Sequence, residues 1–134
     1  MGAPMTIFDL AQRGMSAQMV RMNAAASNLA NAGSVSASEE GTYRAIRPVF
    51  AEELDKSTGM ASVRVQAVVR ENAQPVKQHM PDHPLADENG DVWTSPVDEN
   101  SEMVEMMESA RQYQNLVEAL TTAKQLMIDT MRLK

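Results

Sequence analysis

Residues 101–134 read SEMVEMMESARQYQNLVEALTTAKQLMIDTMRLK. Along this stretch one set of positions advances by alternating steps of three and four residues, the spacing of a helix that packs along another helix. The set comprises Met103, Met106, Ala110, Tyr113, Val117, Leu120, Lys124, Met127 and Met131. Only Lys124 departs from its apolar character. An unbroken helix here would be about 50 Å long at about 1.5 Å per residue, so it needs a partner of similar length.

The beginning of the chain supplies a matching pattern. The same alternation of steps relates Phe8, Ala11, Met15, Gln18, Met22, Ala25 and Leu29. Gln18 is the polar exception, and one polar residue in such a seam fixes its register at some cost in stability. The sequence therefore predicts that the two ends of the chain form two long helices that pair.

The first helix is predicted to begin near Thr6, a good N-cap with Asp9 three residues later in the capping-box position. It is predicted to end near Asn31. Asn28 and Asn31 share a face, and two interpretations are open: they cap the helix end, or they hydrogen-bond to a neighbouring chain.

The start of the second helix also has two candidates. Ser95 is a favoured N-cap and Pro96 after it suits the first helical position. Asp98 and Asn100 are equally good caps, so the helix can instead begin a few residues later.

The middle of the chain has a different character. Residues 33–42 read GSVSASEEGT, the composition of a mobile linker. Apolar and polar residues alternate over 63–70, which predicts a strand with one buried face. Pro48 restricts any strand around it to a sheet edge or a bulge. Asn89-Gly90 is a favoured hairpin turn.

Together these elements predict an α+β fold in which the two terminal helices pair as a discontinuous coiled-coil domain around a small β-rich insert. The predicted boundaries are 1–33 for the N-terminal helix, 34–94 for the linker and the insert, and 95–134 for the C-terminal helix. With only two Phe, two Tyr and one Trp against twelve Met, the helices suit shared interfaces better than a rigid monomeric core.

Charge and composition exclude several classes of function. Residues 34–100 hold twelve acidic and six basic residues, which matches the whole formal charge of −6 and argues against a nucleic-acid partner. Without cysteine there is no disulfide, iron–sulfur cluster or thiolate zinc site. No run approaches the roughly 18 apolar residues of a transmembrane helix, so no membrane insertion is predicted. The N-terminus lacks the basic and apolar regions of a cleaved signal peptide.

No pattern for catalysis, a cofactor or a metal emerges. His79 and His83 are four residues apart, but Pro81 between them is incompatible with the helix that this zinc-ligand spacing requires. The acidic turn 87–91 lacks the alternating ligands of a calcium loop. Nothing indicates a nucleophile or a phosphate-binding loop, so the sequence predicts a protein that is not an enzyme.

Residues 15–35, MSAQMVRMNAAASNLANAGSV, resemble the N-terminal signature of the bacterial flagellar rod and hook family, an amphipathic helix that ends in Asn-Leu-Ala-Asn. Further resemblances are Tyr43-Arg44-Ala45, His83-Pro84-Leu85-Ala86-Asp87 with Asn89-Gly90, Glu102-Met103-Val104, and Ser109-Ala110-Arg111-Gln112-Tyr113-Gln114. Asp91 departs from the family, which usually shows an aromatic residue after the glycine.

This resemblance implies a structural subunit of the basal-body rod, the drive shaft that crosses the periplasm and transmits torque. It implies export without a cleaved signal peptide through the flagellar type III export apparatus. It also implies assembly into a helical hetero-oligomer, with other rod subunits and the rod-to-ring adaptor as partners. Two alternatives stay open on the residues alone: a coiled-coil adaptor that forms a discrete oligomer, and a β insert that binds a ligand at residues 79–91.

The interface expected between subunits combines seam positions from both helices with the two asparagines at the end of the first. Its predicted members are Met15, Met22, Asn28, Leu29, Asn31, Met103, Met106, Tyr113, Val117, Leu120 and Met127.

Overall fold

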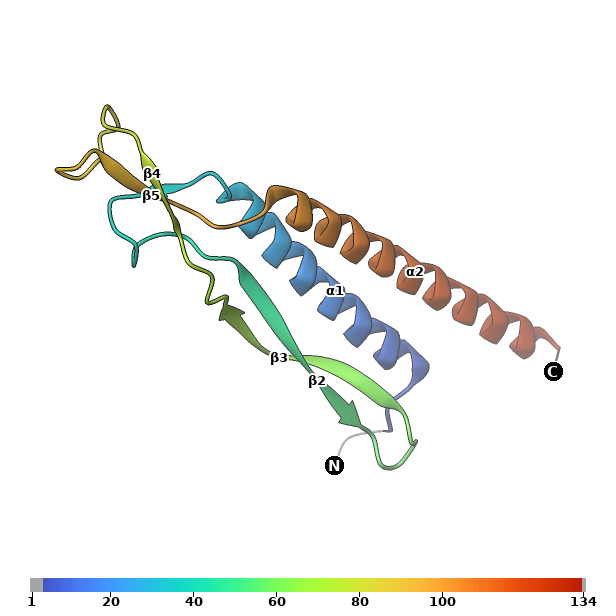
Figure 1. The fold of residues 1–134 in the computed structure, drawn as a ribbon. Coiled ribbons are helices and arrows are strands. Elements are labelled where there is room, and N and C mark those ends of the chain that lie inside the picture. The colour runs from blue at the N-terminus through green and yellow to red at the C-terminus, as the bar shows by residue number, and fades with distance from the viewer. Residues whose placement is uncertain (1–3, 134) are drawn as a thin grey trace.

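A computed structural model describes residues 4–133 as two long helices and five strands (Figure 1). In chain order these are α1 (Ile7–Ala30), β1 (Val35–Ser36), β2 (Ile46–Leu54), β3 (Ala61–Arg70), β4 (Val76–His79), β5 (Asp91–Thr94) and α2 (Glu99–Arg132). The predicted mixture of terminal helices and a β-rich middle is confirmed. Coiled-coil geometry between the helices stays a prediction.

Helix α1 begins and ends where its sequence predicts. The Thr6 side chain accepts a hydrogen bond from the Asp9 N–H at 3.2 Å, and the Asp9 carboxylate accepts one from the Thr6 N–H at 3.0 Å. This reciprocal pair is a capping box, which satisfies two free amides of the first turn. At the other end, the C-cap is Asn31, whose side-chain amide donates to the Ser27 carbonyl at 2.8 Å.

Of the two predicted starts for α2, the later one is found. Asp98 is the N-cap, and its carboxylate accepts hydrogen bonds from the Asn100 N–H and the Ser101 hydroxyl. Ser95 lies in the extended segment before the helix, where its N–H donates to the Ser34 carbonyl at 3.1 Å. The serine therefore joins the two segments that follow α1 and precede α2.

Strands β2 and β3 form an antiparallel hairpin, so the strand predicted over 63–70 is found. Its predicted buried face is present only in part, because Val63 and Val65 are half-buried whereas Ala67 and Val69 are exposed. Gly59 takes a φ of 75° in the connecting turn, a conformation that other residues rarely adopt. Pro48 lies in a two-stranded sheet with two free edges, next to an irregularity between Val49 and Phe50, which agrees with its predicted restriction to an edge or a bulge.

The other three strands form an antiparallel sheet in the order β1-β5-β4. Its strand β1 lies within residues 33–42, which the composition predicts to be a linker, so that prediction misses local structure. The Thr42 side chain is buried and donates a hydrogen bond to the Ser38 carbonyl at 2.8 Å. Serine and threonine side chains compete for backbone groups in this way and hold turns in place.

The two helices run antiparallel and in contact. Arg21 of α1 forms an ion pair with Glu105 of α2 at 2.7 Å, and Asn28, farther along α1, bonds to Glu102, earlier in α2. Helix α1 also contacts β2 and β3, so it lies between α2 and the hairpin (Figure 1).

Burial supports the predicted register of α1 and corrects half of the register of α2. All predicted positions of α1 are buried or half-buried. Of the predicted α2 positions, Met106, Ala110, Tyr113 and Leu120 are half-buried, whereas Met103, Val117, Lys124, Met127 and Met131 are exposed. The most deeply buried α2 residues are instead Glu102 and Ser109. Both are polar, so a prediction that is based on the spacing of apolar residues does not include them.

The end of α2 extends past the start of α1 (Figure 1). Residues 124–133 are here called the overhang, and every one of them except Ile128 is exposed. At the opposite end of the molecule, connecting segments join the three-stranded sheet to the helices and the hairpin (Figure 1).

Candidate functional site

The family motif at the end of α1 places Asn28 at a junction of three segments. Its side-chain oxygen accepts hydrogen bonds from the Ile46 N–H at 2.8 Å and the Tyr43 hydroxyl at 2.7 Å. Its amide nitrogen donates to the Ile46 carbonyl at 3.0 Å and to Glu102 at 3.1 Å. The side chain is fully buried and its donors and acceptors are used within the chain. Asn28 is therefore neither a helix cap nor a surface group.

Glu102 brings α2 into the same junction. Only 1% of this residue is exposed, and both of its carboxylate oxygens meet the guanidinium of Arg47 in β2. The Arg47 Nε donates in addition to Glu71, just after β3, at 2.7 Å. The bond to Glu102, followed by the one to Glu71, raises the pKa of Arg47 above its ordinary value. Asn28, Arg47, Glu71 and Glu102 are here called the clasp.

The clasp is a structural arrangement rather than a reactive one. Burial of one carboxylate is compensated by a bidentate arginine and an amide, which leaves no free group for proton transfer. No buried side-chain nitrogen or oxygen among the described residues lacks a hydrogen-bond partner. The clasp joins α1, α2 and the hairpin through hydrogen bonds and an ion pair.

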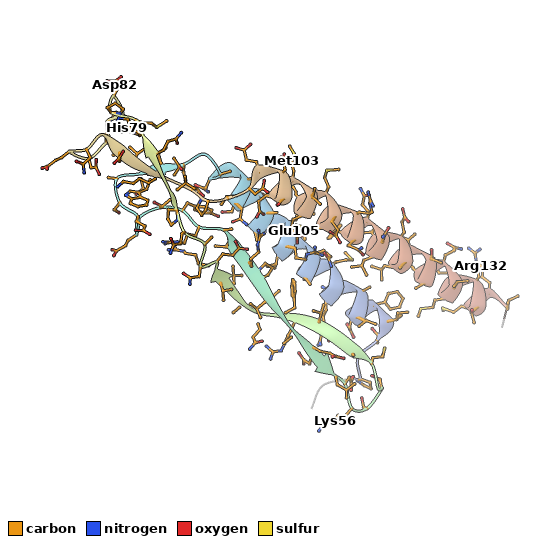
Figure 2. All side chains as sticks on the ribbon, in the orientation of Figure 1. Lys56, His79, Asp82, Met103, Glu105 and Arg132 are labelled. Carbon is orange, nitrogen blue, oxygen red and sulfur yellow. The ribbon has the colours of Figure 1, made fainter. Side chains whose placement is uncertain are left out.

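Outside the clasp, the first turns of α2 present an apolar surface to solvent. Met103, Val104 and Met107, here called the outer patch, are 53%, 62% and 64% exposed. Figure 2 shows Met103 pointing away from α1, whereas Glu105 points toward it. A hollow of about 290 Å³ lies beside Val104 and Met107. Contiguous exposed apolar groups of this kind mark interaction surfaces.

The overhang forms a second exposed apolar region at the other end of α2. Leu126, Met127 and Met131 are 61%, 51% and 69% exposed. Between the outer patch and the overhang, the solvent-facing residues of α2 are mainly polar, so the two apolar regions are separate. Arg132, near the end of the helix, lies beyond the start of α1 (Figure 2).

The residues predicted to lie between subunits fall into three groups. Met103, Val117 and Met127 are exposed; Met15, Met22, Leu29, Asn31, Met106, Tyr113 and Leu120 are half-buried; and Asn28 is buried. Their role between subunits stays a prediction. The predicted site residues do not include Glu102, Arg47 or Ser109. Glu102 and Ser109 each open one of the quoted family motifs, which is a sequence signal for both, whereas Arg47 lies in none of them.

His79 ends β4, and His83 lies in the loop between β4 and β5. No group of three or more potential metal ligands occurs among residues 4–133. His79 instead pairs with Asp91 at 3.0 Å, and Lys77 lies 3.6 Å from the same carboxylate. The bond to His79, with a smaller effect of Lys77, lowers the pKa of Asp91. Asp91 thus has His79 and Lys77 as partners at the position where the family usually carries an aromatic residue.

Comparisons with known proteins agree with the arrangement of terminal helices. Residues 8–34 match the family described as flagella basal body rod protein, and residues 88–133 match the C-terminal family of flagellar basal body rod FlgEFG proteins. The chain is 41% identical over 133 residues to the flagellar basal-body rod protein FlgC of Salmonella typhimurium, covering 98% of both chains. It belongs to the FlgC family of flagellar basal-body rod proteins.

Two further relatives support the same family assignment. FlgC of Escherichia coli O157:H7 is 40% identical over 131 residues and 98% of both chains. FlgC of Aquifex aeolicus is 35% identical over 120 residues, which is 88% of this chain and 87% of that protein. The resemblance noted in the sequence is therefore confirmed, and it favours a rod subunit over the coiled-coil adaptor.

Membership in the FlgC family fixes the general role of the chain. It is a structural subunit of the flagellar basal-body rod, it assembles with other rod components, and it is not an enzyme. Within residues 4–133, neither helix has a stretch apolar enough to span a membrane.

Proposed function

We propose that this rod subunit binds its neighbours through the outer patch and the overhang of α2, so that polymerisation covers both apolar regions and forms the shaft that transmits torque. The observation that supports this proposal is that the apolar side chains of the overhang are exposed. Successive residues of a helix point about 100° apart, so Leu126, Met127 and Ile128 point in three directions. A helix segment that is apolar on several sides is of the kind found buried.

The partners that would cover these regions are other rod subunits, in a helical hetero-oligomer. A contact of one surface with a different surface on the next subunit generates an open helical assembly when the rotation between subunits does not close into a ring. The half-buried seam residues Met106, Tyr113 and Leu120 would contribute from the side of α2 that also meets α1. The rod-to-ring adaptor is a further proposed partner.

The path to the rod is also a proposal. The chain would leave the cytoplasm through the flagellar type III export apparatus without a cleaved signal peptide, and would then fold and assemble in the periplasmic space. Membership in the FlgC family of rod proteins supports this route.

The test places a charge in the overhang and compares it with the same charge on a polar position. We expect Met127→Asp combined with Met131→Asp to abolish rod formation in a strain whose own gene has been deleted, because buried carboxylates there would lack partners. Thr122→Asp, at an exposed polar position of the same helix, is the matched control and should leave rods intact. Electron microscopy of isolated basal bodies and a motility assay give the result.

Normal rods and motility with the doubly substituted protein would overturn the assignment of the overhang. Leu120→Asp should also block incorporation. It is the weaker test, because Leu120 is half-buried within the chain and the substitution also disturbs the fold.

A further inference from the structure

The carboxylate of Glu102 depends on partners that are remote in sequence. It lies in the first turns of α2, yet the groups that compensate its burial are the guanidinium of Arg47 and the amide of Asn28. A buried carboxylate without a cation is strongly unfavourable. The first turns of α2 can therefore dock in their observed position only while Arg47 is in place.

Arg47 is in turn placed by the closed hairpin. In the register of β2 and β3, Arg47 is opposite Val69, and Glu71 two residues later accepts the hydrogen bond from its Nε at 2.7 Å. The Glu71 N–H also donates to the Ala45 carbonyl at 2.7 Å, which extends the pairing beyond the strands. With the hairpin open, Glu71 would be separated from Arg47 and the guanidinium would lose this support.

The other polar contact between the helices does not involve the hairpin. Arg21 donates to Glu105 at 2.8 Å and to Gln18 at 2.9 Å, and all three residues belong to α1 or α2. The clasp is thus the place where a charged residue of the hairpin meets α2, and it sits on the same helical turns as Met103 and Val104 of the outer patch.

We infer that the clasp is a conditional latch: the start of α2 docks, and the outer patch acquires its shape, only after the hairpin of β2 and β3 has closed. The link to the outer patch rests on the proposed function, whereas the latch itself is a property of the single chain. In a chain that folds after export, this dependence would delay presentation of an assembly surface until the middle of the chain is folded.

The experiment measures amide hydrogen exchange of residues 102–106 in the full-length monomer while the hairpin is weakened. Val69→Pro removes a backbone donor opposite Arg47, in a hairpin that α1 separates from α2. In the otherwise unchanged chain it should accelerate exchange at the start of α2 by about tenfold, a coupling in the range found for residues that share a network.

A second background separates the latch from general destabilisation. With Arg47→Met and Glu102→Met together, the ion pair is replaced by apolar side chains of similar size, which folded proteins often tolerate. There Val69→Pro should leave exchange in α2 nearly unchanged. With Arg21→Met as the matched control background, which removes the ion pair independent of the hairpin, Val69→Pro should still accelerate exchange about tenfold.

Gly59→Val supplies a milder change if Val69→Pro unfolds the chain. It strains the far turn of the hairpin through its φ of 75°, and a Cβ there meets no atom within 4 Å. Three results would each overturn the latch. Exchange could accelerate equally in the unchanged chain and in the chain with Arg47→Met and Glu102→Met. Exchange could fail to accelerate in the unchanged chain, or the amides of α2 could be unprotected in the intact monomer. Because exchange is read in the monomer, a failure of the assembly surface would not alter this result.

Discussion

Residues 99–109 and residues 124–133 are the two ends of one helix, and they differ in what holds them. The first end buries Glu102 and Ser109, whose polar groups are satisfied by Arg47, Asn28 and the Glu105 carbonyl. The second end is richer in apolar residues and yet lies in solvent past the start of α1. The buried polar groups of the first end are satisfied within the chain, whereas the apolar side chains of the second end are exposed and, in our proposal, contact other chains.

This inversion of the usual pattern follows from geometry. At the first end, α2 packs against the alanine-rich part of α1, where Ala24, Ala25 and Asn28 are buried, and the Arg47 side chain of the hairpin reaches Glu102. Polar groups are tolerated there because each has a partner. At the second end there is no segment of the described chain to pack against, so apolar side chains stay exposed.

The largest effect on stability is expected from removing the ion pair of the clasp at the first end of α2. Arg47→Ala should lower the free energy of unfolding by about 3 kcal/mol, because it leaves the Glu102 carboxylate buried without a cation. Urea denaturation followed by circular dichroism measures the change. Arg64→Ala is the control: its ion pair with Glu53 at 3.5 Å is exposed, so its loss should cost less than about 1 kcal/mol. Equal losses for the two variants would contradict the role given to the clasp.

The clasp also shows where reasoning from sequence stops. Helix positions, their caps and the β3 strand could be predicted, because local periodicity and cap chemistry determine them. The register of α2 could be predicted only in part. Met106, Tyr113 and Leu120 belong to both the apolar pattern and the less exposed face, but Glu102 and Ser109 do not look like core residues until their partners are known.

The candidate site divides in the same way. The apolar pattern predicts seam residues such as Met103 and Met127, and the structure leaves these two accessible. A sequence motif contains Asn28, yet its partner Ile46 lies 18 residues away in the chain, and its partner Glu102 lies 74 residues away. Contacts at such separations depend on tertiary structure and leave no periodic signal in the sequence.

A smaller effect is expected midway along α2, where the helix still has a partner. A Cβ added to Gly14 would lie 3.1 Å from Leu116 Cδ1, so the helices approach closely there. Gly14→Leu should destabilise the monomer by about 1–3 kcal/mol through overpacking. Ala26→Leu, on an exposed face of the same helix, should change stability by less than about 0.5 kcal/mol. Thermal melts of both variants test this, and similar midpoints would place the helix contact elsewhere.

The cap of α2 should contribute less again. Asp98→Ala is expected to lower the melting midpoint by a few degrees, and Asp98→Asn, which keeps a side-chain acceptor, should restore most of it. Hydrogen bonds from Ser101 and the Asn100 backbone lower the pKa of Asp98 below its ordinary 3.8. Its stabilising effect is therefore full above that pH and declines on acidification, so the Ala variant and the unchanged protein should converge in acid. A constant difference between them down to low pH would contradict the cap.

The smallest effect on stability is expected at the second end of α2. This prediction tests whether the second end, unlike the first, lacks packing within its own chain. Leu126→Ser combined with Met131→Ser should change the free energy of unfolding of the monomer by less than about 0.5 kcal/mol, because these side chains are exposed. The same variant should associate measurably less in sedimentation velocity at high protein concentration, since it loses apolar area available to neighbours. A stability loss as large as that of Gly14→Leu would mean that the overhang packs within its own chain, and the contrast between the two ends of the helix would not hold.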